Sequence, residues 1–124
     1  MEDNTGLASA LIVSRSTDLR DGLHSLLTVS PLIGTIRQAN DGPSALRSIE
    51  DNCPGLVLLD FDLPHEDVLS VLGTIKGHCP DTPCLAFTDH ADKRDEIRTA
   101  GADMVLLKGY PASSLIATIA ELLA

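Results

Sequence analysis

Three side chains of this 124-residue sequence have the types that a phosphoryl-accepting site uses, and each stands directly after a short apolar run: Asp60, Thr88 and Lys108. A carboxylate can attack phosphorus and form an acyl phosphate. A hydroxyl can hydrogen-bond one phosphoryl oxygen, and an ammonium group can pair with the added charge. Each residue alone also has a structural explanation, because Asp60 and Thr88 can cap the helices that follow them and Lys108 can be an exposed charge. The chemistry therefore depends on whether the fold brings the three positions together.

Short apolar runs alternate with segments of helical periodicity along the chain. The apolar runs predict five strands, at residues 8–13, 33–39, 56–59, 84–87 and 104–107. Apolar residues at helical spacing predict five helices, at about residues 17–29, 43–51, 65–76, 91–100 and 111–123. The strict alternation of strand and helix is typical of an α/β domain.

Strands that are apolar along their whole length are buried on both faces, so they indicate a parallel sheet covered by helices on each side. We therefore predict a doubly wound, five-stranded parallel sheet with five flanking helices. We interpret residues 1–7 as an N-terminal tail and residues 8–124 as one domain. Ligands of such sheets bind beyond the carboxyl ends of the strands, so we expect the three side chains above to converge on one crevice.

The charge of the chain argues against two classes of partner. With 18 acids and 9 bases, the sequence has a formal net charge of −9 and lacks the clustered positive charge that nucleic acids and anionic membranes attract. No apolar run approaches the roughly 18 residues of a spanning helix, and the acidic start does not resemble a signal peptide. We expect a cytoplasmic protein that makes no direct contact with nucleic acid or membrane.

The three cysteines, Cys53, Cys79 and Cys84, are an odd number in a sequence without a secretory signal. Such usage favours reduced thiols. Cys79 and Cys84 stand near His78, but four residues between two cysteines is not a usual zinc spacing and no second pair of ligands follows. We expect buried or loop thiols rather than a metal site.

The segments around the three chemical side chains resemble those of receiver domains of two-component response regulators. The matching segments, in chain order, are NDG at 40–42 with AL at 45–46, LLDFDLP at 58–64, LAFT at 85–88, and AGAD at 100–103 with LLK at 106–108. The resemblance covers residues 8–123 and implies the flavodoxin-like fold with strand order 2-1-3-4-5. It implies that Asp60 is the phosphoacceptor, Thr88 the phosphoryl-sensing hydroxyl and Lys108 the charge partner.

The resemblance also implies a place in a phosphorelay that transmits signals through proteins. The expected partner is an output domain or a separate effector, with a histidine kinase as a further candidate. Since the last predicted helix reaches residue 123, we expect no output module within this sequence. The helix around residues 92–98 mixes charges of both signs, from which we expect a weak homodimer at most.

The sequence departs from the family at the positions that hold Mg²⁺. Ser14 and Arg15 replace two acids, and Mg²⁺ prefers hard oxygen ligands. Only Asp60 and at most Asp62 remain as side-chain ligands, so we expect weak or absent Mg²⁺ binding and no cofactor. Val105 replaces the aromatic switch residue, and Gly109 follows the Lys where the family has Pro.

Our leading hypothesis is an atypical, degenerate receiver, not an enzyme, that is impaired in Mg²⁺-dependent aspartyl phosphorylation and acts through protein contacts. In it, Arg15 forms an ion pair with Asp60 in place of the metal. The alternative is that Arg15 extends into solvent or pairs with Asp18.

Two other functions remain open. One is a working phosphoacceptor in which Asp62 or Asp89 substitutes as a metal ligand, although we favour a solvated Asp62. The other, from a different class, is a small flavodoxin-like nucleotide- or phosphate-binding protein that uses the hydroxyl-rich loop 14–17 and the helix N-terminus behind it.

Overall fold

The structure is a computed structural model that describes residues 7–124; the predicted tail therefore lies, apart from Leu7, outside the described residues. The strands are β1 (Ala8–Val13), β2 (Ile33–Ala39), β3 (Leu56–Asp60), β4 (Cys84–Thr88) and β5 (Met104–Leu107). The helices are α1 (Thr17–Thr28), α2 (Gly42–Asp51), α3 (His65–His78), the 3₁₀ turn η1 (Ala91–Lys93), α4 (Arg94–Ala100) and α5 (Ala112–Leu123). None of these helices is long and apolar enough to cross a membrane.

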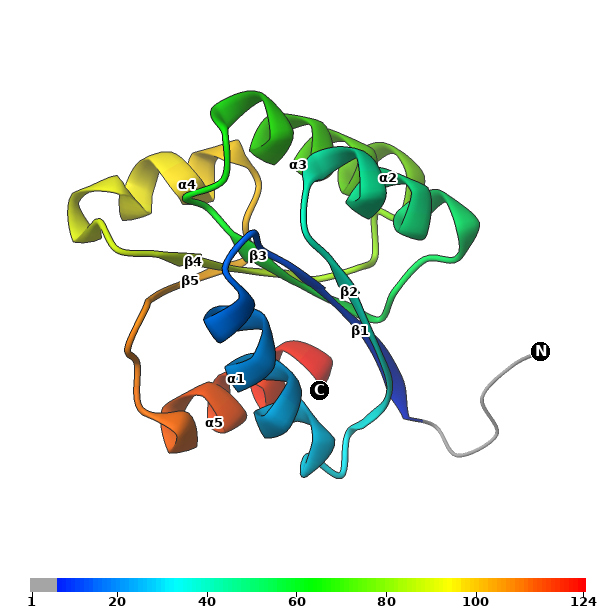
Figure 1. Ribbon diagram of the computed structural model, residues 1–124, viewed down its shortest axis with the longest axis vertical. Coiled ribbons are helices and arrows are strands. Elements are labelled where there is room, and N and C mark those ends of the chain that lie inside the picture. The colour runs from blue at the N-terminus through cyan, green and yellow to red at the C-terminus, as the bar shows by residue number, and fades with distance from the viewer. Residues whose placement is uncertain (1–6) are drawn as a thin grey trace.

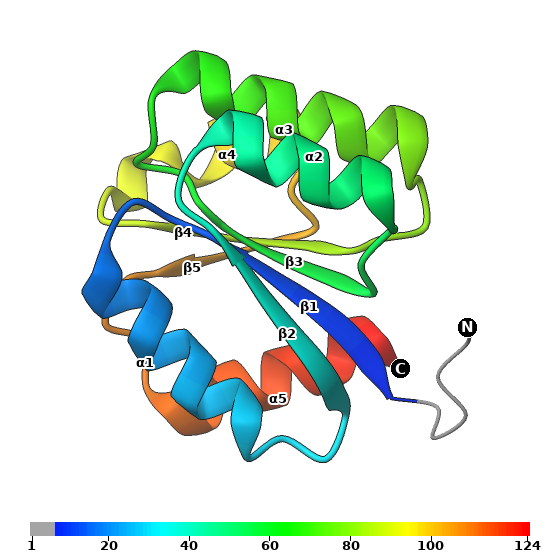
Figure 2. The same cartoon turned by 45° about the vertical axis from the view of Figure 1, so that its right-hand side comes forward.

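The five strands form one parallel sheet in the order β2-β1-β3-β4-β5, which confirms the predicted fold class. Helices α1 and α5 cover one face of this sheet, and α2, α3 and α4 cover the other (Figure 1). The turned view shows α2 and α3 running side by side above the strands (Figure 2). The sheet is thus the middle of three layers, as its apolar strands require.

Alternate residues of each central strand point to opposite layers because side chains alternate along a strand. Leu11 and Val13 pack in the cluster under α2 and α3, whereas Ala10 and Ile12 pack in the cluster under α1 and α5. Every residue of β3 and β4 is buried, including the polar ends of both strands. This burial on both faces explains why the strands read as continuous apolar runs.

The predicted helix over residues 91–100 is divided in the structure. Its first turn is the 3₁₀ turn η1, and the seven-residue helix α4 follows. Ile97 is the one buried residue of α4, because the remaining sequence of this segment is charged or small. Gly101 ends α4 with a φ of 128°, the left-handed conformation that favours glycine at a helix end.

The expectation of three reduced thiols is wrong in the structure, where Cys53 and Cys79 form a disulfide with their Cα atoms 5.8 Å apart. Cys53 follows the end of α2 and Cys79 follows α3, so packing of these two helices brings the cysteines together. Cys84 is free and fully buried on β4. Burial, reinforced by the charge of Asp103, raises the pKa of the Cys84 thiol to about 12.

Candidate functional site

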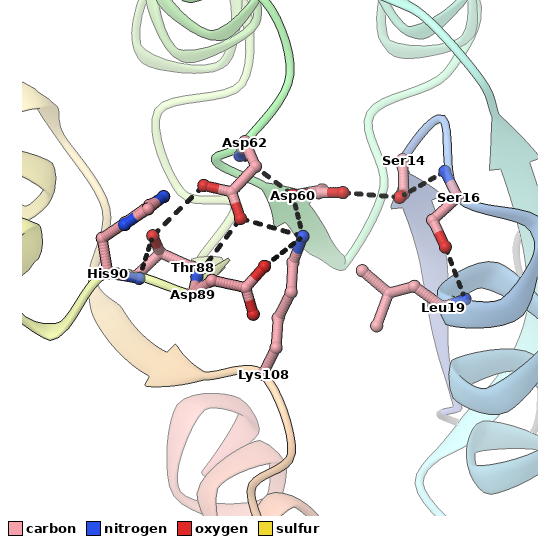
Figure 3. Close-up of polar contacts among 9 residues, drawn as sticks. All are labelled: Ser14, Ser16, Leu19, Asp60, Asp62, Thr88, Asp89, His90 and Lys108. Atoms are coloured by element: carbon pink, nitrogen blue, oxygen red, sulfur yellow. Dashed lines mark hydrogen bonds and ion pairs between the residues drawn. The ribbon is translucent and has the colours of Figure 1, made fainter.

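The carboxyl ends of four strands meet at one edge of the sheet and place four polar side chains there (Figure 3). Asp60 is the last residue of β3 and Thr88 the last residue of β4, while Ser14 and Lys108 directly follow β1 and β5. The parallel direction of the strands makes these ends neighbours although they are far apart in the sequence. The predicted convergence of Asp60, Thr88 and Lys108 is therefore found in the structure.

Lys108 bridges two carboxylates at the centre of this site. Its Nζ lies 2.9 Å from Asp60 Oδ1 and 2.9 Å from Asp62 Oδ2, with Asp89 Oδ2 further away at 3.9 Å. The side chain of Asp60 is 6% exposed and that of Asp62 24% exposed, so the pair with Asp60 is largely shielded from bulk water and the pair with Asp62 only partly. Such pairs interact more strongly than ion pairs on an open surface.

Both carboxylate oxygens of Asp60 have partners. The hydroxyl of Ser14 donates to Oδ2 at 2.7 Å, and the backbone N–H of Asp62 donates to Oδ1 at 2.9 Å. The Ser14 oxygen in turn accepts from the backbone N–H of Ser16 at 3.0 Å. Ser14 thus links the loop after β1 to the carboxylate at the end of β3.

Asp62 is an exposed residue, in keeping with the expected loop acid, but its carboxylate is held in the site by hydrogen bonds and an ion pair. Its backbone N–H bonds the Asp60 carboxylate, and this turn brings its own carboxylate back toward Lys108. Thr88 Oγ1 donates to Asp62 Oδ1 at 3.3 Å, and the backbone N–H of Asp89 donates to Oδ2 at 3.2 Å. These contacts of Asp62 depend on the backbone conformation of the loop after β3. The spacing of residues in the sequence does not reveal that conformation.

The network changes the proton affinity of its members. Burial alone would raise the pKa of Asp62, but the hydrogen bonds from Lys108 and Asp89 and the charge of Lys108 outweigh it and lower that pKa. Burial alone would lower the pKa of Lys108, but its contacts with Asp60 and Asp62 raise it. Each shift favours the charged form, so the bridge holds over a wide range of pH.

Thr88 contacts both the site and the segment that follows β4. Its hydroxyl donates to Asp62, and its oxygen accepts from the backbone N–H of His90 at 3.1 Å, at the start of η1. A role of Thr88 at the start of the following helical segment is therefore compatible with a role in the site.

Arg15 does not pair with Asp60, which contradicts the leading hypothesis for this residue. Ser14 points into the site, and Arg15 is exposed. Within residues 7–124 Arg15 makes no ion pair; its charge acts instead on Asp41, whose pKa is lowered mainly by Ser44 and slightly by Arg15. The positive charge beside Asp60 is the ammonium group of Lys108.

Arg20 is a residue that the sequence did not single out. Its Nη1 donates to the carbonyl oxygen of Ser14 at 2.7 Å, and its Nε donates to Gln38 Oε1 at 3.2 Å. Both contacts hold the end of β1 against β2. Its place in the first turns of α1 was the only signal, and that signal does not show which neighbour the side chain reaches.

Val105 on β5 and Gly109 after it are the two positions near Lys108 at which the sequence departs from the family. Val105 is buried, 6% exposed, and packs with Ala86, Ile97 and Ala102 under α4. Gly109 has a φ of 87°, and the peptide bonds of the described residues are all trans. Where an aromatic ring could alternate between buried and exposed positions, this chain therefore has a small side chain fixed in the core.

Comparisons with known proteins agree on one family. A sequence profile for the response regulator receiver domain matches residues 10–120. The transcriptional regulatory protein PrrA of Mycobacterium bovis is 30% identical over 97% of this chain and 52% of its own length. The response regulator MprA of a Mycobacterium species is 31% identical over 91% of this chain and 49% of its own length. The chain thus spans about half the length of these curated relatives.

Solved structures give the same picture. A crystal structure of NtrX from Brucella abortus superimposes with a TM-score of 0.84 at 30% identity, covering 94% of this chain and 27% of that one. The receiver domain of NtrX alone gives a TM-score of 0.80 at 28% identity and covers 93% of this chain and 98% of that one. The likeness to both structures extends over nearly the whole chain.

Proposed function

The chain belongs to the response regulator receiver domain family, and from this premise we propose that it is an atypical receiver in which Mg²⁺-dependent phosphorylation of Asp60 is impaired. As a receiver it is a module of two-component signalling, and we propose that it has no enzymatic activity and acts through contacts with proteins. The alternative of a nucleotide- or phosphate-binding protein gains no support from the family match. The observation that carries the proposal is the bridge from Lys108 to both Asp60 and Asp62.

The donors at this edge fit Mg²⁺ poorly. A magnesium ion needs several oxygen ligands in near-octahedral array. Here one oxygen of Asp60 accepts from Ser14, the other is held by Lys108 and the Asp62 N–H, and Lys108 stands beside the Asp62 carboxylate as well. A cation would have to displace an ammonium group from two short contacts. We therefore propose no step through the ion.

Charge balance supports the same proposal. Two acids at positions 14 and 15 would add negative charge beside Asp60 and would favour a bound cation. Ser14 adds none and provides a hydrogen bond instead, and Arg15 carries a positive charge. Lys108 then compensates the remaining carboxylates from within the chain.

The proposal is tested by incubating the purified protein with acetyl phosphate and Mg²⁺ and measuring its intact mass. We expect little or no covalent phosphoryl adduct. A stoichiometric adduct that disappears in the Asp60→Asn variant would overturn the proposal.

A gain-of-function variant sharpens this test. Replacing Ser14→Asp together with Arg15→Asp restores oxygen ligands at the end of β1, so we expect Mg²⁺-dependent adduct formation to appear. Adding Asp60→Asn in that background should remove the adduct again. If the double variant folds but stays unmodified, the missing acids do not explain the impairment.

The position of Asp62 favours a second candidate, a working phosphoacceptor with a substitute metal ligand. The Asp62 carboxylate lies in the site and shares Lys108 with Asp60, whereas Asp89 is 63% exposed and more distant. If this candidate is correct, the protein without substitutions forms a phosphoryl adduct in the presence of Mg²⁺, and the Asp62→Asn variant forms much less of it. The mass measurement above therefore decides between the two candidates.

We further propose the partners and the setting of the module. The partner is a protein, either an output domain or a separate effector, and a histidine kinase is the candidate upstream. The exposed charges of both signs on α4 support a weak homodimer, and the net charge of −9 argues against direct contact with nucleic acid or membrane. Light scattering over a range of protein concentrations tests the homodimer, and fractionation of cells tests the proposed cytoplasmic location.

A further inference from the structure

The disulfide of Cys53 and Cys79 lies at the edge of the sheet opposite to Asp60. Cys53 precedes the amino end of β3, and Cys79 precedes the amino end of β4, whereas the Lys108 network occupies the carboxyl ends. The two sites share no residue. The chemistry of the disulfide can therefore be tested independently of the proposed function.

The two sulfur atoms differ in access. Cys53 belongs to an exposed loop, whereas Cys79 is 4% exposed beneath the end of α3. His78 is exposed as well, and a ring nitrogen of this residue lies within 4.8 Å of both sulfur atoms. The pair thus combines an exposed residue with a buried one.

We propose that Cys53 and Cys79 form a reversible redox site that a peroxide oxidises and a dithiol reduces. In the forward direction the Cys53 thiolate attacks one peroxide oxygen, the O–O bond breaks, and hydroxide leaves a sulfenic acid on Cys53. The Cys79 thiolate then attacks this sulfur, the S–O bond breaks, and the hydroxide takes up a proton to leave as water. In sum, two thiols and one hydrogen peroxide give one disulfide and two molecules of water.

The assignment of roles follows from exposure. A peroxide reaches Cys53 from solvent, and Cys79 needs to meet only the neighbouring sulfur, with Cα atoms 5.8 Å apart. Cys84 stays outside this chemistry because it is fully buried on β4 and far from ionisation, with a pKa raised to about 12 by burial. The thiolate is the reactive form of cysteine, so Cys84 serves as an internal control.

Oxidation at this site acts on the α2–α3 pair. At the other end of the two helices, the backbone N–H of Gly42 donates to Asp67 Oδ2 at 3.3 Å. The disulfide, with a sequence separation of 26, adds a covalent link between their carboxyl ends. In the oxidised protein the two helices are therefore linked at both ends. In the reduced protein they are linked only at the end with Gly42 and Asp67.

The test compares the reduced and the peroxide-treated protein by intact mass and by thermal unfolding. We expect peroxide to remove the mass of two hydrogen atoms and to raise Tm by about 5–15 °C, because a disulfide restricts the unfolded chain. Dithiothreitol should reverse both changes under native conditions. The Cys53→Ser and Cys79→Ser variants should each lose the shift, and the Cys84→Ala variant should keep it.

Labelling with iodoacetamide makes the test independent of whether the variants fold. In the unmodified oxidised protein no cysteine should react until the chain is unfolded, when only Cys84 does. In the reduced native protein Cys53 should react first. The proposal is overturned if dithiothreitol opens the disulfide only after unfolding, if peroxide leaves the mass and Tm of the reduced protein unchanged, or if Zn²⁺ binds the reduced protein and blocks its oxidation.

Discussion

Lys108 contacts two carboxylates, and the free energy of these contacts depends on how far they are removed from water. Removal of one partner from a buried pair is costly because it leaves a charge without compensation. Asp60 would keep its bonds from Ser14 and from the Asp62 N–H, which limits this cost. The importance of the bridge can therefore be measured by deleting the ammonium group alone.

The Lys108→Met variant should unfold with a free energy lower by about 1–3 kcal/mol at neutral pH. Denaturant unfolding measures this change. Lys93→Met is the control, since Lys93 is exposed and makes no ion pair in the described part of the chain; we expect it to stay within about 0.5 kcal/mol of the unmodified protein. Equal stabilities of the two variants would show that the bridge contributes nothing.

The lowered pKa of Asp62 makes a prediction for acid stability. In the unfolded chain this carboxyl titrates near the ordinary value of 3.8, and in the folded protein it titrates lower, because Lys108 and Asp89 outweigh the effect of burial. The stability that charged Asp62 contributes is therefore complete above about pH 5 and is lost as the pH falls through the folded pKa. The Asp62→Asn variant should lose less stability on acidification, by about 1 kcal/mol or less.

Unfolding free energies at several pH values between neutral and acid measure this difference. The control is Asp81→Asn, because Asp81 is exposed on the loop before β4 and makes no ion pair among the described residues. A profile of Asp62→Asn that is as steep as that of the unmodified protein would contradict the prediction.

At the scale of single residues, the sequence predicted which positions meet but not every direction of a side chain. Asp60, Thr88 and Lys108 end apolar runs, and the ends of parallel strands are neighbours in any such sheet. The directions of Asp62 and Arg15 depend on the backbone angles of loops, which spacing does not determine. At these two positions the contacts of the side chains could therefore not be predicted from the sequence.

At the scale of elements, the contact between α2 and α3 depends on a residue without a side chain. A Cβ atom added at Gly42 would lie 2.8 Å from Asp67 Cγ, closer than atoms normally approach. The Asp67 carboxylate would have to move, and its bond from the Gly42 N–H would weaken. Gly42 therefore allows the first turns of the two helices to approach each other.

The Gly42→Ala variant should be destabilised by about 1–2 kcal/mol because of this contact. Gly73→Ala is a matched control in α3, because a Cβ atom there meets nothing within 4 Å. In that exposed helical position alanine should stabilise the protein by about 0.5–1 kcal/mol. Changes of the same sign in the two variants would show that the space around Gly42 is not limiting.

The sequence predicted the helices and strands well where the apolar periodicity and the glycine or proline residues indicated the same boundaries. Gly101 and Pro111 mark the end of α4 and the start of α5, and both boundaries lie close to the prediction. The division of the predicted helix over 91–100 was missed, because a charged segment with a single buried residue, Ile97, has no clear period. Weak burial leaves the local backbone free to begin as a 3₁₀ turn.

At the scale of the whole molecule, two effects of salt oppose each other. A net charge of −9 destabilises the compact chain by self-repulsion, and salt screens this repulsion. Salt also weakens ion pairs, but those of Lys108 are partly shielded from solvent. We therefore expect the relief of repulsion to dominate.

Thermal unfolding at about 50 mM and about 500 mM NaCl tests this balance, and we expect Tm to rise by a few degrees. The Lys108→Met variant should show at least as large a rise, since it has one positive charge fewer and no bridge to lose. A fall in Tm with salt would mean that attractive pairs dominate the electrostatics of the fold.

The disulfide could not be predicted from the sequence because it depends on the packing of elements in the whole molecule. Its two cysteines come from the ends of different helices, and only the packing of α2 on α3 brings them within bonding distance. A count of three cysteines without a signal sequence favoured the opposite expectation. The sheet order could be expected from resemblance, whereas this contact depends on how the two helices pack in three dimensions.

The scarcity of aromatic residues gives the molecule one natural optical reporter. The chain has no tryptophan and a single tyrosine, Tyr110, which is 42% exposed and stands two residues after Lys108. Its fluorescence at excitation wavelengths for tyrosine therefore comes from one loop, without background from the rest of the fold. A movement of the segment that carries Lys108 would change the intensity or anisotropy of that emission without any attached dye.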